Sequence, residues 1–215
     1  MVVRRPLVLV AGLVRELPLG DNRLPDVPEG MDPLAGWYQH SANFFAVGTG
    51  TPASGTASFL PHVVGPRTTT YDAFVFAVGT AQSGGSTTLR LALYPDDGTR
   101  CAPDVSGGPL RTATVTNAFT AVTTAQVAVF TGGAWAGDPG LYWTMALYTE
   151  ATTPTTKPVF QCLSNVCRSL PLPSGTSVAT QARALSLTGQ TTFPTSKPTA
   201  IVGGTSAPEV MLRAA

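Results

Sequence analysis

Charge is the scarcest property of this sequence. Only 12% of its 215 residues are Asp, Glu, Lys or Arg, against roughly a quarter in an average soluble domain, and the formal net charge is +1. Two of the cations are lysines, and the eleven arginines are scattered, with Arg4 and Arg5 as the one adjacent pair. Because binding to nucleic acid needs Lys and Arg gathered on one face, the sequence predicts no nucleic-acid partner.

Long apolar runs are also missing. The longest run near the start, residues 6–14, contains Gly12 and is followed by Arg15, and it falls well short of the roughly 18–20 residues of a membrane span. The two arginines followed by this apolar run resemble the start of a signal peptide, but the run is short and no clear small-residue cleavage site follows it. We therefore expect neither a membrane partner nor secretion.

Residues that disfavour helix interiors are abundant in this sequence. The chain has 22 Gly, 19 Pro and 31 Thr, about a third of all its residues, and these types disfavour helix interiors. This composition excludes a helical bundle or a coiled coil. Hydrophobic residues nevertheless make up 43% of the chain, which is enough for a folded core.

Cysteine is rare and odd in number. The three cysteines are Cys101, Cys162 and Cys167, which is not typical of a disulfide framework. Free buried thiols are the favoured interpretation, with a local bridge between Cys162 and Cys167 as the alternative. A zinc site is a weaker third reading, because the two histidines, His40 and His62, lie about a hundred residues away from that pair.

The N-terminal region differs from the rest of the chain. Residues 1–18 contain two short β-prone runs that meet at Ala11 and Gly12, which predicts a small hairpin. Because an isolated hairpin is marginal in water, we expect it to dock on another surface. Residues 19–35, rich in Pro and acidic residues, predict a stiff linker. The apolar residues expected to make the docking contact are Pro6, Leu7, Val8, Leu9, Val10, Leu13 and Leu17.

From residue 36 to residue 215, β-prone runs alternate with turn clusters. Residues 69–78 are apolar on both alternating sets after Asp72, as in a strand covered on two faces, and residues 87–94 alternate as a half-buried strand does. No helical pattern separates the runs, so the prediction is an all-β chain with one antiparallel β-sandwich domain. Further strands are expected at 112–116, 121–130, 141–148, 158–163, 177–187 and 209–213, with a short helix as the alternative for 177–187.

Catalytic motifs are absent from the sequence. No Gly-x-Ser-x-Gly elbow occurs, and the glycine-rich stretch 48–55 lacks the Gly-Lys-Ser/Thr ending of a phosphate loop, so we expect a flexible loop there. His40 and His62 have no distinctive partner in sequence and are expected to be structural or surface residues. The sequence therefore predicts no catalytic residue, no cofactor, no metal and no enzyme activity.

Three residues are candidates for surface recognition: Trp135, Asp96 and Asp97. The two aspartates follow the run 87–94 in a turn. Paired carboxylates suit glycoside hydrolysis, and together with Asp104 they suit binding of a calcium ion. Because the side chains of neighbours in a tight turn usually diverge, a solvated turn is the favoured interpretation. Trp135 sits among small residues, either as a cover over the end of the sandwich or as a contact with a partner. Trp143 lies inside a β-run and is expected to be core.

Two regions resemble proteins of tailed-bacteriophage virions. The segment RPLVLVAGLVRELPLGD at 5–21 resembles a recurrent phage segment that commonly has Lys where this chain has Arg5. The segments LRLALYPDDG at 89–98 and DPGLYW at 138–143 are similar to a jelly-roll-like domain of minor tail, tail-fibre and head-fibre proteins. The proline-rich acidic linker departs from the usual pattern of that opening.

The resemblance implies a non-enzymatic structural protein of the virion, assembled in the host cytoplasm. It implies a homotrimer that contacts other virion proteins of tail or head through the N-terminal arm and displays the sandwich outward, where it can contact host-surface glycans. Three alternatives stay open: a glycan-binding module or carbohydrate-active enzyme, a capsid fibre or decoration protein, and a secreted bacterial sandwich domain.

Overall fold

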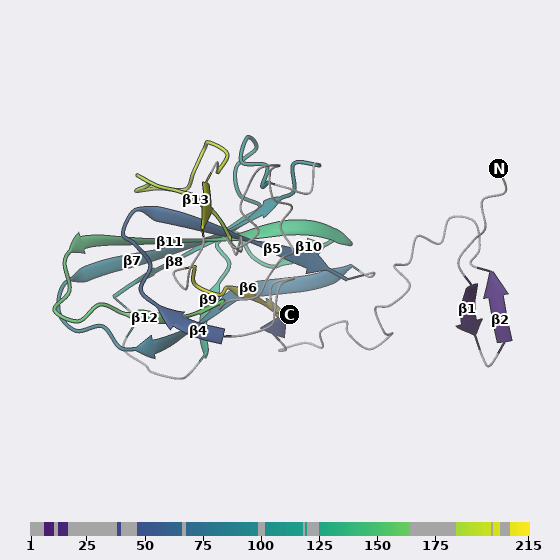
Figure 1. Cartoon of the computed structure of the whole chain (residues 1–215), viewed down its shortest axis with the longest axis horizontal. Coiled ribbons are helices and arrows are strands. Elements are labelled where there is room, and N and C mark those ends of the chain that lie inside the picture. Colours follow the sequence, from purple (N-terminus) through teal and green to yellow (C-terminus); the bar gives the residue numbers. More distant parts are fainter. Residues whose placement is uncertain are drawn as a thin grey trace.

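The protein is described by a computed structural model. It covers residues 7–10, 13–16, 38–39, 47–65, 68–98, 102–117, 119, 125–163, 184–198, 200–202 and 207–215. These residues form strands and turns without any helix, so none of them belongs to a helix that could cross a membrane (Figure 1). The predicted all-β class is confirmed.

Two antiparallel sheets form a β-sandwich (Figure 1). The six-stranded sheet has the order β14-β13-β5-β11-β7-β8, with β5 (Thr56–Val64), β7 (Ser86–Pro95), β8 (Arg111–Thr116), β11 (Gly140–Thr152), β13 (Ala184–Leu187) and β14 (Ala200–Val202). The seven-stranded sheet has the order β3-β15-β6-β12-β4, with β9 and β10 also paired to β6. Its strands are β3 (Tyr38–Gln39), β4 (Val47–Gly50), β6 (Thr69–Thr80), β9 (Ala125–Val129), β10 (Trp135–Gly137), β12 (Val159–Leu163) and β15 (Met211–Ala214).

The main core lies between the two sheets. Alternate residues of β6 and β7 fill it, because successive side chains of a strand point to opposite faces. Four aromatic rings meet at its centre: Phe119 packs edge-on against Phe76, Tyr148 and Phe160, with ring centroids 5.3–6.5 Å apart. Such edge-to-face pairs add to the stabilisation that burial alone provides.

A second apolar cluster covers the opposite face of the six-stranded sheet. Phe59, Tyr94 and Trp143 form its centre and are fully buried. Val105 and Phe193, from two loops, pack on this face. The six-stranded sheet is therefore buried on both sides, and the loops that cover it become part of the fold.

The strand predictions agree well with the observed strands. The run 69–78 is confirmed as β6, which is covered on both faces: Ala73, Phe74, Val75 and Phe76 are at most 1% exposed. The run 87–94 is β7, whose Leu89, Leu91 and Leu93 face the main core as expected. The runs at 112–116, 141–148, 158–163 and 209–213 also correspond to strands, whereas for 121–130 and 177–187 only the parts from 125 and from 184 lie within the described residues, and both are strands.

Two loop predictions were wrong in part, because a short strand occupies some of the residues in each. In the stretch 48–55, expected to be a flexible loop, the first residues belong to β4, which pairs with β12. Glycine lacks a side chain but still supplies the N–H and C=O that a ladder needs, so Gly48 and Gly50 do not prevent pairing. The small-residue loop around Trp135 likewise contains a strand, β10, which pairs with β6.

The N-terminal runs pair with each other. β1 (Leu7–Val10) and β2 (Leu13–Glu16) are antiparallel and form a two-stranded sheet of their own. Pro6, Leu17 and the predicted linker at 19–35 lie outside the described residues, as do Cys101, Cys167 and His40. The docking role of this hairpin stays a prediction.

Candidate functional site

The turn after β7 carries the two adjacent aspartates. Asp96 accepts a hydrogen bond on Oδ2 from the backbone N–H of Gly98 (2.9 Å), and Gly98 has a φ of +84°, which glycine adopts without strain. The loop is closed where the N–H of Asp97 donates to the carbonyl of Ala102 (3.0 Å) and the N–H of Asp104 to that of Pro95 (2.8 Å). The turn predicted from the sequence Pro-Asp-Asp-Gly is therefore well defined.

Asp96 turns its carboxylate toward the second apolar cluster. Its Oδ1 accepts a hydrogen bond from Nε1 of Trp143, at 2.9 Å. The indole is fully buried, and β11 sets it directly beside Tyr94 of β7. Because a buried indole N–H needs an acceptor, Asp96 satisfies a polar group of the core.

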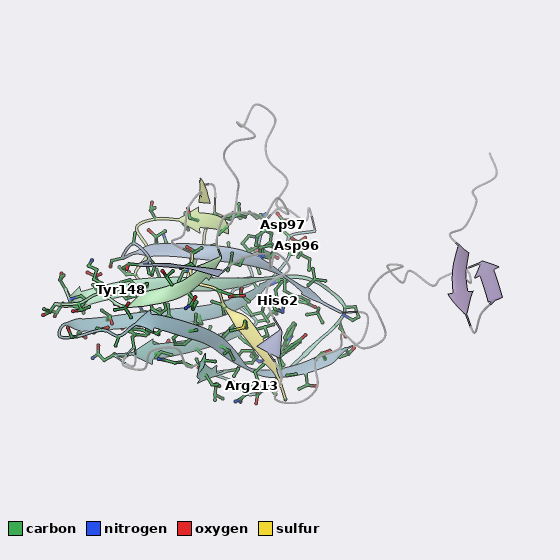
Figure 2. All side chains as sticks on the ribbon, turned by 60° about the horizontal axis from the view of Figure 1, so that its bottom comes forward. His62, Asp96, Asp97, Tyr148 and Arg213 are labelled. Atoms are coloured by element: carbon green, nitrogen blue, oxygen red, sulfur yellow. The ribbon has the colours of Figure 1, made fainter. Side chains whose placement is uncertain are left out.

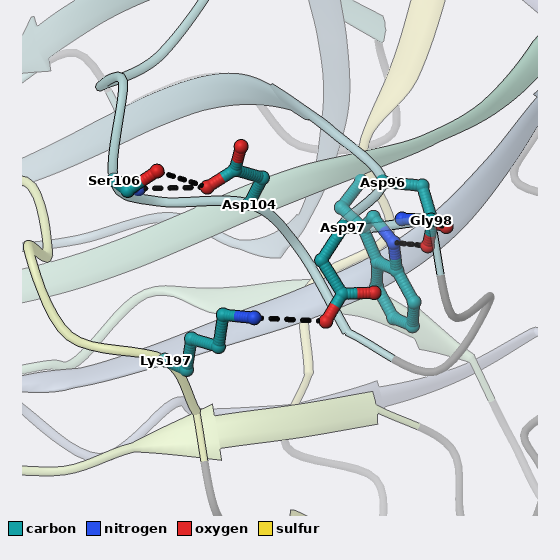
Figure 3. A network of polar contacts seen from close by, with 7 residues as sticks. Asp96, Asp97, Gly98, Asp104, Ser106 and Lys197 are labelled. Atoms are coloured by element: carbon teal, nitrogen blue, oxygen red, sulfur yellow. Dashed lines mark hydrogen bonds and ion pairs between the residues drawn. The ribbon is translucent and has the colours of Figure 1, made fainter.

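Asp97 points to a different partner. Its Oδ2 lies 2.9 Å from Nζ of Lys197, in the loop that follows β13 (Figure 3). The side chain of Asp97 is 9% exposed, whereas that of Lys197 is 54% exposed. The hydrogen bond to Asp97, reinforced by the nearby charges of Asp97, Asp104 and Asp96, raises the pKa of the Lys197 ammonium. Lys197 is thus the counter-ion of this acidic turn.

Asp104 completes the group without facing the other two carboxylates. Its Oδ1 accepts hydrogen bonds from the hydroxyl (2.6 Å) and the N–H (3.0 Å) of Ser106, and these bonds lower the pKa of Asp104. Figure 3 shows the three carboxylates directed at separate partners. Within the described part of the chain, no three His, Cys, Asp or Glu side chains come together as metal ligands. This arrangement suits a structural role, in which each carboxylate holds its own partner in place. It offers no pair of carboxylates facing each other, as a glycosidase requires.

We expect Asp96 to matter for stability through Trp143. Asp96→Ala leaves the buried indole N–H without its acceptor, which costs about 1–3 kcal/mol of the free energy of unfolding. Asp96→Asn keeps an acceptor oxygen and is expected to cost less. Urea unfolding of the two variants beside the wild type measures the difference. Equal midpoints for Asp96→Ala and the wild type would argue against this role.

Trp135 lies at the same end of the sandwich as the aspartate turn, because its ring contacts Tyr142, whose partner in β7 is Pro95. It belongs to the core between the two sheets and covers this end rather than lying in an open loop. Its ring stacks on Tyr71 (centroids 5.7 Å apart, planes at 23°) and meets Tyr142 edge-on (4.8 Å, 77°). The residue is only 9% exposed. Of the two alternatives, this geometry favours the cover over the sandwich end. Recognition of a partner by Trp135 stays a prediction, and little of the residue's surface is available for it.

The segment around Trp135 is held by neighbouring groups. Arg111 donates to the carbonyls of Gly133 (3.0 Å) and Ala134 (2.9 Å), immediately before the ring. At Gly137 a Cβ would lie 2.6 Å from the indole of Trp135, so that only glycine lets the ring fold back over the chain. The small residues around Trp135 are therefore explained by packing.

The remaining candidates are internal. His62 in β5 is fully buried, as expected for a structural histidine. Cys162 is a free, buried thiol, and burial raises its pKa to about 12. The interpretation as a free buried cysteine is confirmed for this residue.

An ion pair lies on the side of the sandwich opposite Asp96 and Asp97 (Figure 2). There, Arg213 contacts both carboxylate oxygens of Asp72, each at 2.7 Å.

Sequence reasoning missed three partners: Trp143 for Asp96, Lys197 for Asp97, and Arg111 for the turn before Trp135. One signal was available, because a tryptophan inside a core strand requires an acceptor and Asp96 directly follows the neighbouring strand. Lys197 lies a hundred residues from Asp97, and nothing local in the sequence connects them.

No family model, no curated protein and no solved structure matches the chain.

Proposed function

We propose that this protein is a non-enzymatic structural component of a tailed-phage virion, a minor tail or fibre protein. One observation carries the non-enzymatic part. The residues that best suited chemistry or recognition are engaged inside the molecule: Asp96 with Trp143, Asp97 with Lys197, and Trp135 with two tyrosines. The virion part rests on the likeness of residues 5–21, 89–98 and 138–143 to phage segments.

The sandwich is proposed to be of the jelly-roll type. Strands far apart in the chain are neighbours in both sheets: β5 pairs with β11 and β13, and β6 pairs with β12 and β15. Antiparallel pairing of strands far apart in the chain, within each of two packed sheets, is typical of double Greek-key sandwiches. The two segments that resemble phage appendage domains lie at the end of β7 and the beginning of β11, which are adjacent strands.

Residues 1–18 are proposed to be the docking arm. Their two strands form a separate two-stranded sheet, and a hairpin of this size is marginal alone in water. Contact with another virion protein of tail or head would supply the missing apolar partner. The sandwich at 36–215 would then face outward, as part of a homotrimer, where it can contact a host-surface glycan. A head fibre or decoration protein shares all of these features and differs only in its place on the particle.

Detection in purified particles tests this proposal. Particles of the phage that encodes this chain are purified from lysed host cells by banding on a density gradient. The amount of the chain relative to a capsid protein is then measured by mass spectrometry. We expect a fixed number of copies per particle in every banded fraction. Presence of the chain in the lysate but not in the particles would refute the virion role. Release of reducing sugar from host envelope, abolished in Asp97→Asn, would instead support the carbohydrate-active alternative.

A further inference from the structure

Among the described residues, β9 is an edge strand that pairs with β6 on one side and with no strand on the other. The N–H of Phe130 donates to the carbonyl of Asp72 (2.9 Å). This bond shows which residues of the segment direct their backbone N–H and C=O groups toward β6. Because antiparallel residues alternate between bonded and non-bonded pairs, Ala125, Val127 and Val129 direct their N–H and C=O groups away from β6. Apart from one bridge at Thr131 to Thr112 of β8, no described strand pairs along that side.

The residues of this region carry no charge of their own, apart from Arg111 at the start of β8, whose guanidinium lies on the carbonyls of Gly133 and Ala134 beyond the end of β9. The 26 residues from Thr112 to Gly137 include no Asp, Glu, Lys, Arg or His, and no Pro. They span most of β8 and all of β9 and β10, the strands on this side of the two sheets. Monomeric proteins commonly protect a sheet edge with lysine, proline or an inward charge, and β9 itself contains none of these.

The exposed side chains of β9 are apolar. Val127 is 40% exposed and Val129 is 65% exposed, and with Val63 they are the large hydrophobic residues most open to solvent in the described part of the chain. An edge that combines free backbone groups, no charge and outward valines is suited to pairing with another strand.

We propose that β9 pairs with β9 of a second copy of this chain, antiparallel about a two-fold axis at Val127. The axis sets Val127 opposite its own copy and Ala125 opposite Val129. These three residues are the ones whose backbone groups point outward, so each pair can exchange hydrogen bonds and the two seven-stranded sheets become continuous. β9 has no charged residue that would favour a partner of opposite charge. In this register its outward N–H and C=O groups match those of its own copy.

The proposal rests on the proposed self-association of a structural protein, but not on a place in a virion. A two-fold contact requires an even number of copies. If a three-fold axis exists elsewhere on the molecule, as the phage resemblance implies, the same edge joins two trimers.

The test is the molar mass of the full-length chain by light scattering over a range of concentrations. We expect an even multiple of 22.2 kDa for the wild type, and half that mass for Val127→Lys, because like charges directly opposite each other repel. Val63→Lys is the matched control, since Val63 is 43% exposed on β5, and it should leave the mass unchanged. A single chain in the wild type, an odd number of copies, or an unchanged mass in Val127→Lys overturns the proposal.

A crosslink tests the same axis without relying on a destabilising charge. Opposed residues of a bonded antiparallel pair have Cα atoms about 5.5 Å apart, which a disulfide can span. Val127→Cys should therefore form a covalent dimer on mild oxidation, well above the background from the native cysteines of the wild type. Thr114→Cys, at an exposed position of β8, should not exceed that background. Equal yields from the two variants would overturn the two-fold at Val127, while detection of the chain in particles would remain a separate result.

Discussion

Replacing Trp135 with alanine is expected to lower the free energy of unfolding by about 3–5 kcal/mol, the usual cost of deleting a large buried aromatic side chain. The ring is 9% exposed and contacts both Tyr71 and Tyr142, so its removal leaves a cavity at the end of the sandwich and abolishes both aromatic contacts. Trp135→Phe keeps part of the packing and should cost less. Urea or thermal unfolding measures both variants.

Gly137 provides an independent check on this packing. A Cβ at this position meets the indole at 2.6–2.7 Å, so Gly137→Ala forces the ring or the strand to move and is expected to cost about 1–3 kcal/mol. In the Trp135→Ala background the ring is gone and the same substitution should cost much less. Such non-additivity identifies a direct contact between the two residues.

The outcome that would contradict this account is a stable Trp135→Ala variant that has lost binding to a glycan or to a virion protein. That result would make Trp135 a recognition residue. A destabilised variant whose Gly137→Ala effect disappears supports the cover over the sandwich end.

Much of the fold could be predicted from the sequence because strand and turn chemistry are local. The apolar residues of 69–78 and the alternating leucines of 87–94 show their burial directly, and Pro95 to Gly98 form a turn whose glycine has the positive φ that the sequence requires. β5 was not anticipated: Pro61 and His62 interrupt its β-prone pattern, yet the strand lies between β11 and β13 and is almost wholly buried.

The candidate site was less predictable because its contacts are long-range. Asp97 and Lys197 meet only because the loop after β13 folds over the outer face of the six-stranded sheet, where Phe193 joins the second apolar cluster. Trp135 was assigned to a loop because its neighbours are small, but small residues also let a strand pass close to a large ring. Lys197 for Asp97 and Tyr71 for Trp135 are both remote in sequence.

Removing residues 1–20 is expected to leave a folded sandwich that no longer enters virions. β1 and β2 pair only with each other in the described structure, so their removal takes no strand from either large sheet. The truncated chain should therefore have the same thermal unfolding midpoint as the full-length chain. Incorporation should fall to background, because the truncated chain lacks the apolar arm residues that we propose bind the particle.

The most direct measurement counts copies in particles assembled while either chain is supplied in trans during infection. Full-length and truncated proteins are expressed at equal levels, and the sandwich peptides common to both are quantified by mass spectrometry of banded virions. The proposed function predicts full-length chain in every particle and truncated chain at background. Truncated chain present at the full-length level would contradict the docking arm, and neither chain present would contradict the virion role itself.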